Sequence, residues 1–143
     1  MRLRGFHYGG GAAYFVTACT RNRDRVLATV VAGHTIPSMI GRIVDAQWHD
    51  IPAFDPAIQL DEWIIMPDHL HGILRFGADA RTTLPRIMAW LKGTSVATAR
   101  VQGVWGHRPL WQRGYYDRII RGEQAMNRIR QYVRSNPTRW SAR

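Results

Sequence analysis

The sequence predicts an α+β domain of the ferredoxin-like, split βαβ type: an antiparallel sheet with helices on one face and an added C-terminal helix. Three observations predict this fold. The chain has 143 residues, enough to bury one sizeable core, so we expect a single domain over residues 1–143. Apolar residues recur with the period of a strand or of a helix in most segments. These segments follow the order strand, helix, strand, strand, helix, strand, helix, which is a split βαβ domain followed by one further helix.

The first half of the chain is expected to hold one strand and one helix. A glycine run at positions 9–11 leads into AYFVTACT, whose aromatic and β-branched residues are typical of a strand. The basic turn RNRDR ends this strand. The stretch from Pro37 to Asp50 has apolar residues at helical spacing, and Ser38 can cap its first turn. The proline-bounded segment IPAFDPA then breaks the helical pattern.

Two strands and a helix are predicted next. The segments IQLDEWIIM and HLHGILRF flank the turn Pro67-Asp68 and are expected to pair with each other. From Leu84 to Val101 the apolar residues follow helical spacing, and Pro85 suits the first turn of a helix. Gly93 weakens this helix without forbidding it.

The C-terminal part is predicted to add a strand and a helix. The segment LWQRGYYDRIIR is rich in aromatic and β-branched residues, which indicates a strand. A helix is expected from Glu123 to Ser135, because Met126, Ile129 and Val133 fall on one helical face. The dipeptide Asn136-Pro137 is expected to end this helix, since the residue before a proline disfavours helical geometry.

The charge of the chain favours a nucleic acid as its partner. The formal net charge is +10 and the pI is about 11.2, and nearly all of the positive charge is arginine because Lys92 is the only lysine. Guanidinium groups match the geometry of phosphate and stack on bases. An anionic membrane surface is the second candidate. A basic surface that only aids solubility, or that reflects genomic base composition, is the alternative without a partner.

Cysteine count and hydropathy exclude several classes of protein. Cys19 is the only cysteine, so one chain cannot build a disulfide framework or a cysteine zinc site. The N-terminal residues lack the apolar core of a signal peptide, and no window approaches the about 20 apolar residues of a membrane helix. We therefore expect a soluble, cytoplasmic protein with no membrane association.

The stretch WIIMPDHLHGIL contains two histidines of one predicted strand. Successive side chains of a strand point to opposite faces, so His69 and His71 share a face, while Leu70 and Gly72 share the other. Two imidazoles at this spacing can bind one divalent ion. The alternative is two half-exposed histidines beside a turn, in which Asp68 stabilises the backbone instead of adding an oxygen ligand.

This stretch, together with WQRGYYDRIIRGEQAMNRIRQYVRSNP, resembles the REP-associated tyrosine transposases, members of the single-tyrosine HUH transposase superfamily. The resemblance covers nearly the whole chain from GGGAAYFVTACTRNR onward. It implies a ferredoxin-like HUH domain that cleaves and rejoins single-stranded DNA, with hairpin-containing DNA as partner, as a monomer or a homodimer. It also implies a tyrosine that forms a 5′-phosphotyrosine link, and a Mg²⁺ or Mn²⁺ ion held by the H-x-H pair. One departure stands at Gly11 to Tyr14, where GAAY replaces the Gly-Thr-Trp with which some members recognise a hairpin.

The resemblance selects Tyr132 as the nucleophile, because the family places its tyrosine on a helix shortly before an Asn-Pro. Tyr116 remains an alternative nucleophile, and Tyr115 would then face the other side of its strand. Asn136 lies one helical turn after Tyr132, so its amide oxygen could join His69 and His71 as a third metal ligand. Without an active site, Tyr132 would be an aromatic flanking the core and Asn136 a helix terminator.

Arginines near these elements are the candidates for nucleic-acid contact. The predicted set is Arg21, Arg23, Arg25, Arg113, Arg118, Arg121 and Arg128. Arg130 and Arg134 are also expected to border the site, with an ordinary solvated helix face as the alternative. Tryptophans can stack on unpaired bases, but the core is the expected place for Trp90, Trp105 and Trp111.

The sequence therefore predicts a metal-dependent single-stranded DNA endonuclease and strand transferase. Two alternatives remain open. One is a non-catalytic ferredoxin-like module that binds single-stranded DNA or RNA. The other is a metal-dependent nuclease that activates water and forms no covalent intermediate.

Overall fold

The computed structural model describes residues 11–141, so positions 9 and 10 of the glycine run lie outside the described residues. The elements in chain order are β1 (Ala12–Cys19), the 3₁₀ turn η1 (Arg21–Arg23), β2 (Ala28–Val31), β3 (His34–Pro37), α1 (Met39–His49), α2 (Ile51–Phe54), β4 (Ile58–Ile65), β5 (His69–Phe76), α3 (Leu84–Val101), β6 (Tyr116–Ile120) and α4 (Glu123–Ser141). Among them, no helix is both long and apolar enough to cross a membrane.

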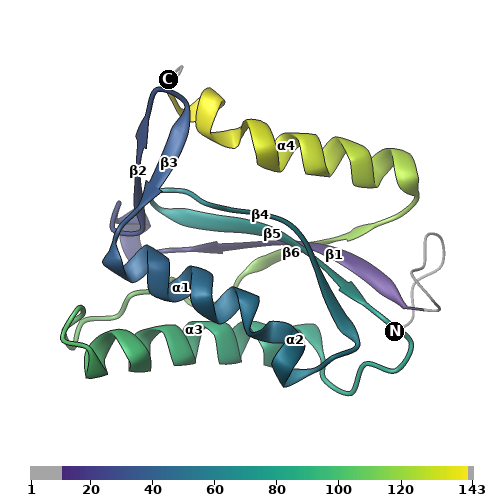
Figure 1. Ribbon diagram of the computed structural model, residues 1–143, viewed down its shortest axis with the longest axis horizontal. Coiled ribbons are helices and arrows are strands. Elements are labelled where there is room, and N and C mark those ends of the chain that lie inside the picture. The colour runs from purple at the N-terminus through teal and green to yellow at the C-terminus, as the bar shows by residue number, and fades with distance from the viewer. Residues whose placement is uncertain (1–10, 142–143) are drawn as a thin grey trace.

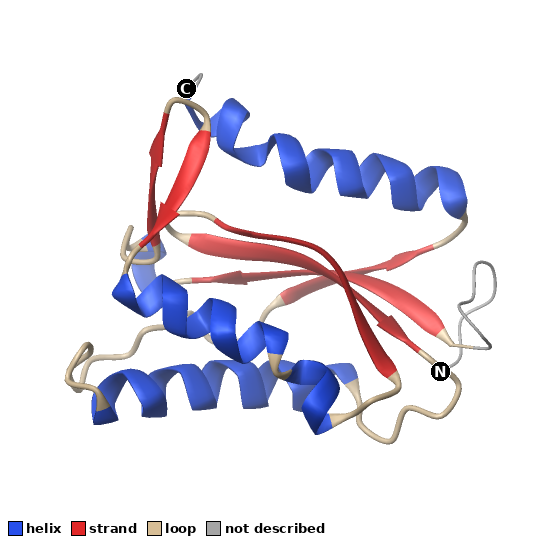
Figure 2. Ribbon diagram, viewed as in Figure 1, coloured by secondary structure: helices blue, strands red, loops and turns tan. Residues whose placement is uncertain are grey.

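Four strands form one antiparallel sheet in the order β4-β5-β1-β6. Helices α1 and α3 cover one face of this sheet, and α4 lies across the opposite face (Figure 1; Figure 2). This order, with the first strand beside the last, is the split βαβ arrangement. The predicted fold class is confirmed, including the added C-terminal helix.

The apolar side chains of β5 alternate between the two faces of the sheet, and each face has its own apolar core. Leu70 and Leu74 belong to the large core under α1 and α3, while Ile73 belongs to the small core under α4. Gly72 is required because a Cβ there would come within 2.4 Å of the Trp48 ring, which stacks on Trp63 with ring centroids 4.0 Å apart. The predicted alternation is confirmed, and it directs both histidines of β5 toward α4.

The hairpin β2–β3 has no counterpart in the sequence prediction. Its strands have four residues each, too few for a clear alternation to stand out. Ala32 and Gly33 form its turn with φ values of 51° and 77°, the left-handed pair of a type I′ turn. The hairpin stands beside the C-terminal end of α4 (Figure 1), and Gly33 lies close to Thr138.

Helix α4 continues through Pro137 to Ser141, so the predicted end at Asn136-Pro137 is wrong. Proline removes one backbone donor and normally breaks a helix interior. Here Pro137 is buried, and contacts made by the last turn compensate. Arg139 donates to the carbonyl of Tyr132 at 2.8 Å, and the Arg25 guanidinium lies 4.8 Å from the centroid of the Trp140 ring.

The last strand is shorter than predicted. The segment LWQRGYYDRIIR was expected to be extended throughout, but β6 begins only at Tyr116. Trp111 makes an isolated bridge with Thr20, and Gly114 then turns the chain with φ of 78°. By contrast, α3 has the predicted bounds, and Ser38 caps α1 by accepting from the N–H of Gly41 at 3.1 Å.

Candidate active site

A cavity of about 360 Å³ lies between the sheet and α4. Side chains from β1, η1, β5, β6 and α4 line it. They include most of the residues that the sequence singled out, together with Arg139, which it did not: His69, His71, Tyr116, Tyr132, Asn136 and Arg23. The two histidines come from β5, and Tyr132 and Asn136 come from the helix that docks on the same face. The tertiary fold therefore brings the predicted histidine pair and the predicted tyrosine together.

Both histidines are buried, at 6% and 7% exposure, so the alternative of two half-exposed histidines beside a turn is wrong. Their ring centroids are 4.5 Å apart. His69 Nδ1 lies 2.7 Å from a carboxylate oxygen of Asp68, and His71 Nδ1 lies 2.8 Å from the hydroxyl of Thr17 on β1. Each imidazole is thus oriented by a neighbouring oxygen, a common arrangement around metal-binding histidines.

Asp68 connects the turn before β5 to the basic segment after β1. Its carboxylate accepts from Arg23 Nε at 3.2 Å as well as contacting His69, and its backbone carbonyl accepts from the N–H of Thr20 at 3.0 Å. Burial favours the protonated acid, but the hydrogen bonds to His69 and Arg23 outweigh it and hold the pKa of Asp68 below its ordinary 3.8. Asp68 therefore stays ionised and fixes both partners.

His71 is held in its neutral form. Burial is the largest cause, and the nearby charges of His69, Arg139 and Arg23 add to it, so that the pKa of His71 falls from 6.5 to about 3. A neutral imidazole is the form that binds metal ions. At pH 7 this histidine needs no proton loss before it can act as a ligand.

Tyr132 lies at the mouth of the cavity, 45% exposed. Its ring meets the His71 ring edge-on with centroids 5.6 Å apart, and the Arg139 guanidinium lies 4.2 Å from its centroid. Arg139 also donates a hydrogen bond to the backbone carbonyl of Tyr132 and another to the hydroxyl of Ser135. One arginine therefore contacts both the ring and the backbone of Tyr132. Arg139 follows the proline that was expected to end the helix, and for that reason the sequence analysis missed it.

The nitrogen and oxygen donors of this cavity suit a divalent ion, although the set is small. Within residues 11–141 no three His, Cys, Asp or Glu side chains stand close enough together to hold a metal. Asn136 is buried in the cavity wall, and its side chain makes no hydrogen bond within the same range. Cys19 also lines the cavity, but burial raises the pKa of its thiol and disfavours the thiolate ligand.

The predicted nucleic-acid-binding arginines separate by position. Arg23 lines the cavity with the histidines, while Arg118 and Arg128 line an adjoining one beside His71 and Tyr132. The rest of the predicted set line neither cavity, and all of them are exposed: Arg21, Arg25, Arg113 and Arg121. Of the predicted set, these three are therefore the arginines within reach of a ligand bound in either cavity.

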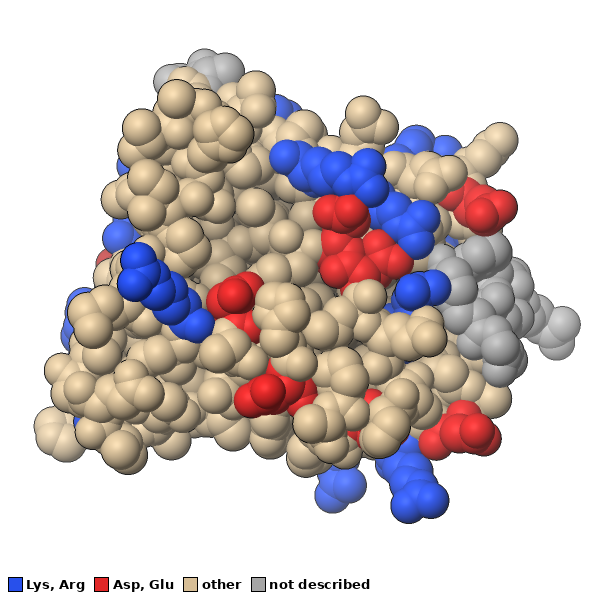
Figure 3. Space-filling model, viewed as in Figure 1, with Lys and Arg blue, Asp and Glu red and all other residues tan. Residues whose placement is uncertain are grey.

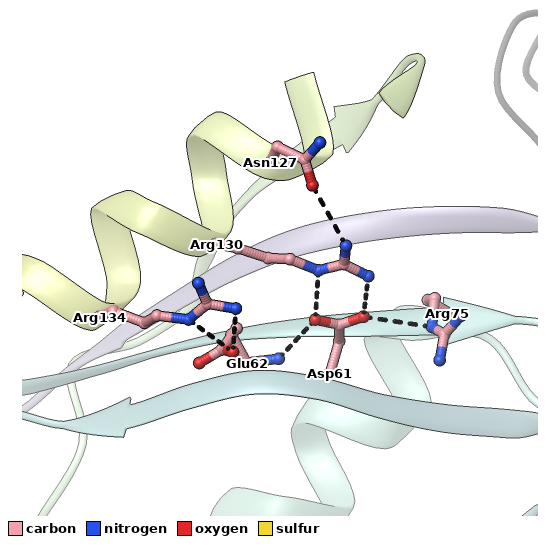
Figure 4. A network of polar contacts seen from close by, with 6 residues as sticks. All are labelled: Asp61, Glu62, Arg75, Asn127, Arg130 and Arg134. Carbon is pink, nitrogen blue, oxygen red and sulfur yellow. Dashed lines mark hydrogen bonds and ion pairs between the residues drawn. The ribbon is translucent and has the colours of Figure 1, made fainter. Parts of the chain in front are cut away.

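Arg130 and Arg134 do not border the site, contrary to the prediction. They point from α4 to β4, where Arg130 makes two hydrogen bonds of 2.9 and 2.7 Å to Asp61 and Arg134 pairs with Glu62 at 2.8 Å (Figure 4). Arg75 adds a third guanidinium, 3.4 Å from Asp61. In Figure 3, basic side chains at the level of α4 lie directly beside a group of acidic ones. These arginines are neutralised within the protein.

Asp61 is the centre of this network. Burial pushes its pKa up, but the hydrogen bonds from Arg130 and from the backbone N–H of Glu62, with the charges of Arg130 and Arg75, outweigh burial and lower the pKa below its ordinary 3.8. Its side chain is only 9% exposed. The network attaches α4 to the edge strand β4.

The remaining aromatic candidates divide between the large core and the cavity. Trp90, Trp105 and Trp111 pack in part against the large core, as expected for tryptophans. Tyr115 also packs there, whereas Tyr116 is 61% exposed and lines the cavity with Tyr132. Two cavity residues that the sequence analysis did not single out, Thr17 and Phe15, lie on the α4 face of β1, and the alternation of AYFVTACT could have identified that face.

Comparisons with known proteins agree with this fold. The family model described as "Transposase IS200 like" matches residues 11–136. An uncharacterised protein of Haemophilus influenzae is 30% identical over 163 aligned positions, which cover 98% of this chain and 88% of that protein. The structure of a REP-associated tyrosine transposase bound to a REP hairpin superposes with a TM-score of 0.68 at 18% identity, over 97% of this chain and 73% of that one. A candidate transposase from Deinococcus radiodurans r1 superposes with a TM-score of 0.58 at 23% identity, over 93% and 95% of the two chains.

Proposed function

Because the chain belongs to the IS200-like transposase family, we propose that it is a metal-dependent single-stranded DNA endonuclease and strand transferase with Tyr132 as nucleophile. The family membership confirms the resemblance noted in the sequence and makes the chain a transposase-type enzyme. One observation carries the finer proposal: a single cavity gathers Tyr132, both histidines and Asn136 from two elements far apart in the sequence.

The proposed reaction exchanges one phosphodiester for another. The hydroxyl oxygen of Tyr132 attacks the phosphorus and loses its proton, while the bond from phosphorus to O3′ breaks and O3′ takes up a proton. The products are a 5′-phosphotyrosine and a free 3′-OH. A 3′-OH of another strand then attacks the phosphotyrosine, restores a phosphodiester and releases Tyr132. No ATP is needed, because the covalent link keeps the bond energy.

The residues of the cavity fit Mg²⁺ or Mn²⁺ as cofactor. The imidazoles of His69 and His71 would hold the ion, because the contact of each Nδ1 with an oxygen of Asp68 or Thr17 fixes the orientation of its ring. The amide oxygen of Asn136 is the third protein ligand in this assignment, with water completing the shell. When bound, the ion supplies positive charge that stabilises the negative charge developing on the phosphate oxygens.

Other side chains of the cavity act on the phosphate and on the nucleophile. Arg23 and Arg139 line the cavity as cations, so they can bind the non-bridging oxygens of the scissile phosphate. Asp68 keeps Arg23 and His69 in place, and Arg139 holds the ring of Tyr132. Prepositioned groups of this kind lower the barrier because they need no rearrangement during the reaction.

Single-stranded DNA that contains a hairpin is the partner we propose. The net charge of +10 and the exposed arginines support a polyanionic partner. The REP-associated tyrosine transposase that this chain resembles in fold is bound to a REP hairpin, which supports hairpin-containing DNA as the class of partner. Both a monomer and a homodimer are compatible with this proposal.

The test is a search for the covalent intermediate. The protein is incubated with end-labelled, hairpin-containing single-stranded DNA and Mg²⁺ or Mn²⁺, and the products are separated on a denaturing gel. We expect a protein-linked label that disappears with EDTA and in Tyr132→Phe, a loss of at least about 10³-fold for removal of a nucleophile.

Three other outcomes contradict the proposal in different ways. Cleavage without a protein-linked label indicates a nuclease that activates water. Binding without cleavage indicates a non-catalytic module for single-stranded DNA or RNA. An adduct that persists in Tyr132→Phe and disappears in Tyr116→Phe assigns the nucleophile to β6 in place of α4.

A further inference from the structure

We propose that a second cavity, next to the candidate active site and floored by Phe15, binds an unpaired nucleobase beside the cleaved phosphodiester. The cavity measures about 480 Å³, within the roughly 300–1,000 Å³ typical of ligand sites. This inference rests on the proposed function for the position of the phosphodiester, but the occupant is argued from the cavity itself.

The two cavities share one wall. Thr17, His71 and Tyr132 line both of them. A strand whose phosphate lies against His71 and Tyr132 therefore has a cavity on either side. Because consecutive nucleotides are covalently linked, the nucleotide next to that phosphate is placed at the mouth of the second cavity.

The second cavity is lined by apolar side chains and by two arginines. Phe15 on β1 and Ala125 and Ile129 on α4 provide apolar surface, and Phe15 is only partly buried. Arg118 on β6 and Arg128 on α4 are exposed, and no ion pair joins either of them to a carboxylate among residues 11–141. An aromatic ring with arginines around it is the arrangement with which proteins bind unpaired bases and their phosphates.

The first cavity is the more polar of the two. Arg23, Asn136 and Arg139 line it, and its polar side chains suit the phosphate and the metal ion. The Phe15 ring centroid lies 5.1 Å from that of His71 and 6.1 Å from that of Tyr132, so the apolar floor borders the reacting groups directly. The division of polar and apolar lining assigns the phosphate to one cavity and the base to the other.

This arrangement gives a physical reason for using a single strand. A base inside the second cavity has its faces and edges against Phe15 and α4, so it cannot pair with a complementary strand. Duplex DNA must therefore unpair at this position, which costs free energy. Unpaired DNA avoids this cost.

The experiment maps the base by photocrosslinking. The Tyr132→Phe variant, which leaves the strand uncleaved, is mixed with a single-stranded oligonucleotide carrying 5-iodouracil and irradiated, and crosslinked peptides are identified by mass spectrometry. We expect the main crosslink at Phe15, with at least tenfold less from the same sequence in a duplex. Arg118→Gln and Arg128→Gln should each reduce it severalfold.

Phe54 provides the matched control, since it is a half-exposed aromatic of α2, and α2 lies on the opposite side of the sheet from α4 (Figure 1). Phe54→Leu should leave the crosslink at Phe15 unchanged. Crosslinks that map elsewhere and leave the Phe15 peptide unmodified, or equal yields from single strand and duplex, overturn the inference.

Failure of this inference differs from failure of the proposed function. An adduct on Tyr132 without any crosslink at Phe15 keeps the function and removes the base site. A crosslink at Phe15 without any adduct in the unmodified protein keeps a single-strand binding cavity and removes the catalytic proposal.

Discussion

Both sides of α4 carry arginines, but the arginines of the two sides have different surroundings. On the side toward β4, Arg130 and Arg134 are paired with Asp61 and Glu62. On the side toward the histidines, Tyr132, Asn136 and Arg139 line a cavity. The difference teaches that an arginine of α4 that is paired with a carboxylate of β4 is a weaker candidate for DNA contact than one that faces a cavity.

The comparison also separates stability from activity. The β4 side attaches the helix through ion pairs, of which the one between Arg130 and Asp61 is mostly shielded from solvent. The cavity side leaves polar groups oriented and accessible. Substitutions on the two sides should therefore have different consequences, which the predictions below order by expected effect.

After removal of the proposed nucleophile itself, the largest effect is expected on the cavity side, at His71. His71→Ala should lower the rate of adduct formation by about 10²–10³-fold, because it removes a proposed metal ligand next to the developing charge. Single-turnover gels measure the rate, and electron paramagnetic resonance of Mn²⁺ measures the binding of the ion. Removing the ion with EDTA should reproduce the loss, and a variant that keeps both rate and Mn²⁺ binding would falsify the metal assignment.

On the β4 side, Asp61→Asn should destabilise the protein and spare the chemistry. We expect the free energy of unfolding to fall by about 2 kcal/mol, between the values for exposed and buried pairs, since Arg130 and Arg75 are both 28% exposed. Urea denaturation followed by circular dichroism measures this loss. The adduct rate, measured well below the melting temperature, should stay unchanged, and a large rate loss would show that the two sides are not separable.

The same carboxylate predicts how stability depends on pH. The pKa of Asp61 is lower in the folded protein than its ordinary 3.8, so its contribution is fully present above that value and is lost as the pH falls through the folded pKa. The difference in unfolding free energy between the parent and Asp61→Asn should therefore be constant from neutral pH down to about 5 and shrink below pH 4. A difference that grows in acid would contradict the lowered pKa.

Arg139 should have a smaller effect than His71 on the cavity side. Arg139→Gln should slow adduct formation about tenfold, the equivalent of 1.4 kcal/mol, because the ring of Tyr132 loses the cation that holds it. Arg139→Lys, which keeps the charge, should recover part of the rate. Arg134→Gln on the other side of the helix is the control, and equal losses in both variants would rule out a specific role for Arg139.

The smallest effect should come from Arg128, which faces the second cavity. Arg128→Gln should weaken single-stranded DNA binding a few-fold and reduce the slope of log K against log salt by about 1, as expected for one lost phosphate contact. Fluorescence anisotropy at several salt concentrations measures both. Arg134→Gln should leave the slope unchanged, since its guanidinium is already paired with Glu62.

Several features of the site could be predicted because they depend on short-range geometry. The two-residue period of β5 placed His69 and His71 on one face, and the structure confirms that face. Asn136 follows Tyr132 by one helical turn, and both line the same cavity. Spacing along a strand or helix is set by covalent geometry, so it can be read from the chain directly.

Other features escaped prediction because they depend on distant partners. Pro137 was expected to end α4, and the contacts that carry the helix past it come from Arg139 and from Trp140 against Arg25. The sequence could not distinguish the roles of Arg130 and Arg128. Folding places Arg130 against Asp61 of β4, whereas Arg128 lines the second cavity. Local propensity is a weak constraint when tertiary contacts oppose it.

The sequence by itself determined the order of the four sheet strands and the three long helices, the faces of the strands, the basic charge and the resemblance to a transposase family. The tertiary structure decided that α4 docks on the histidine face, how deeply the histidines are buried, and which arginines are neutralised. The first group follows from periodicity and composition, which are properties of the chain. The second group follows from packing and charge pairing between residues far apart in sequence, and these exist only once the fold has brought them together.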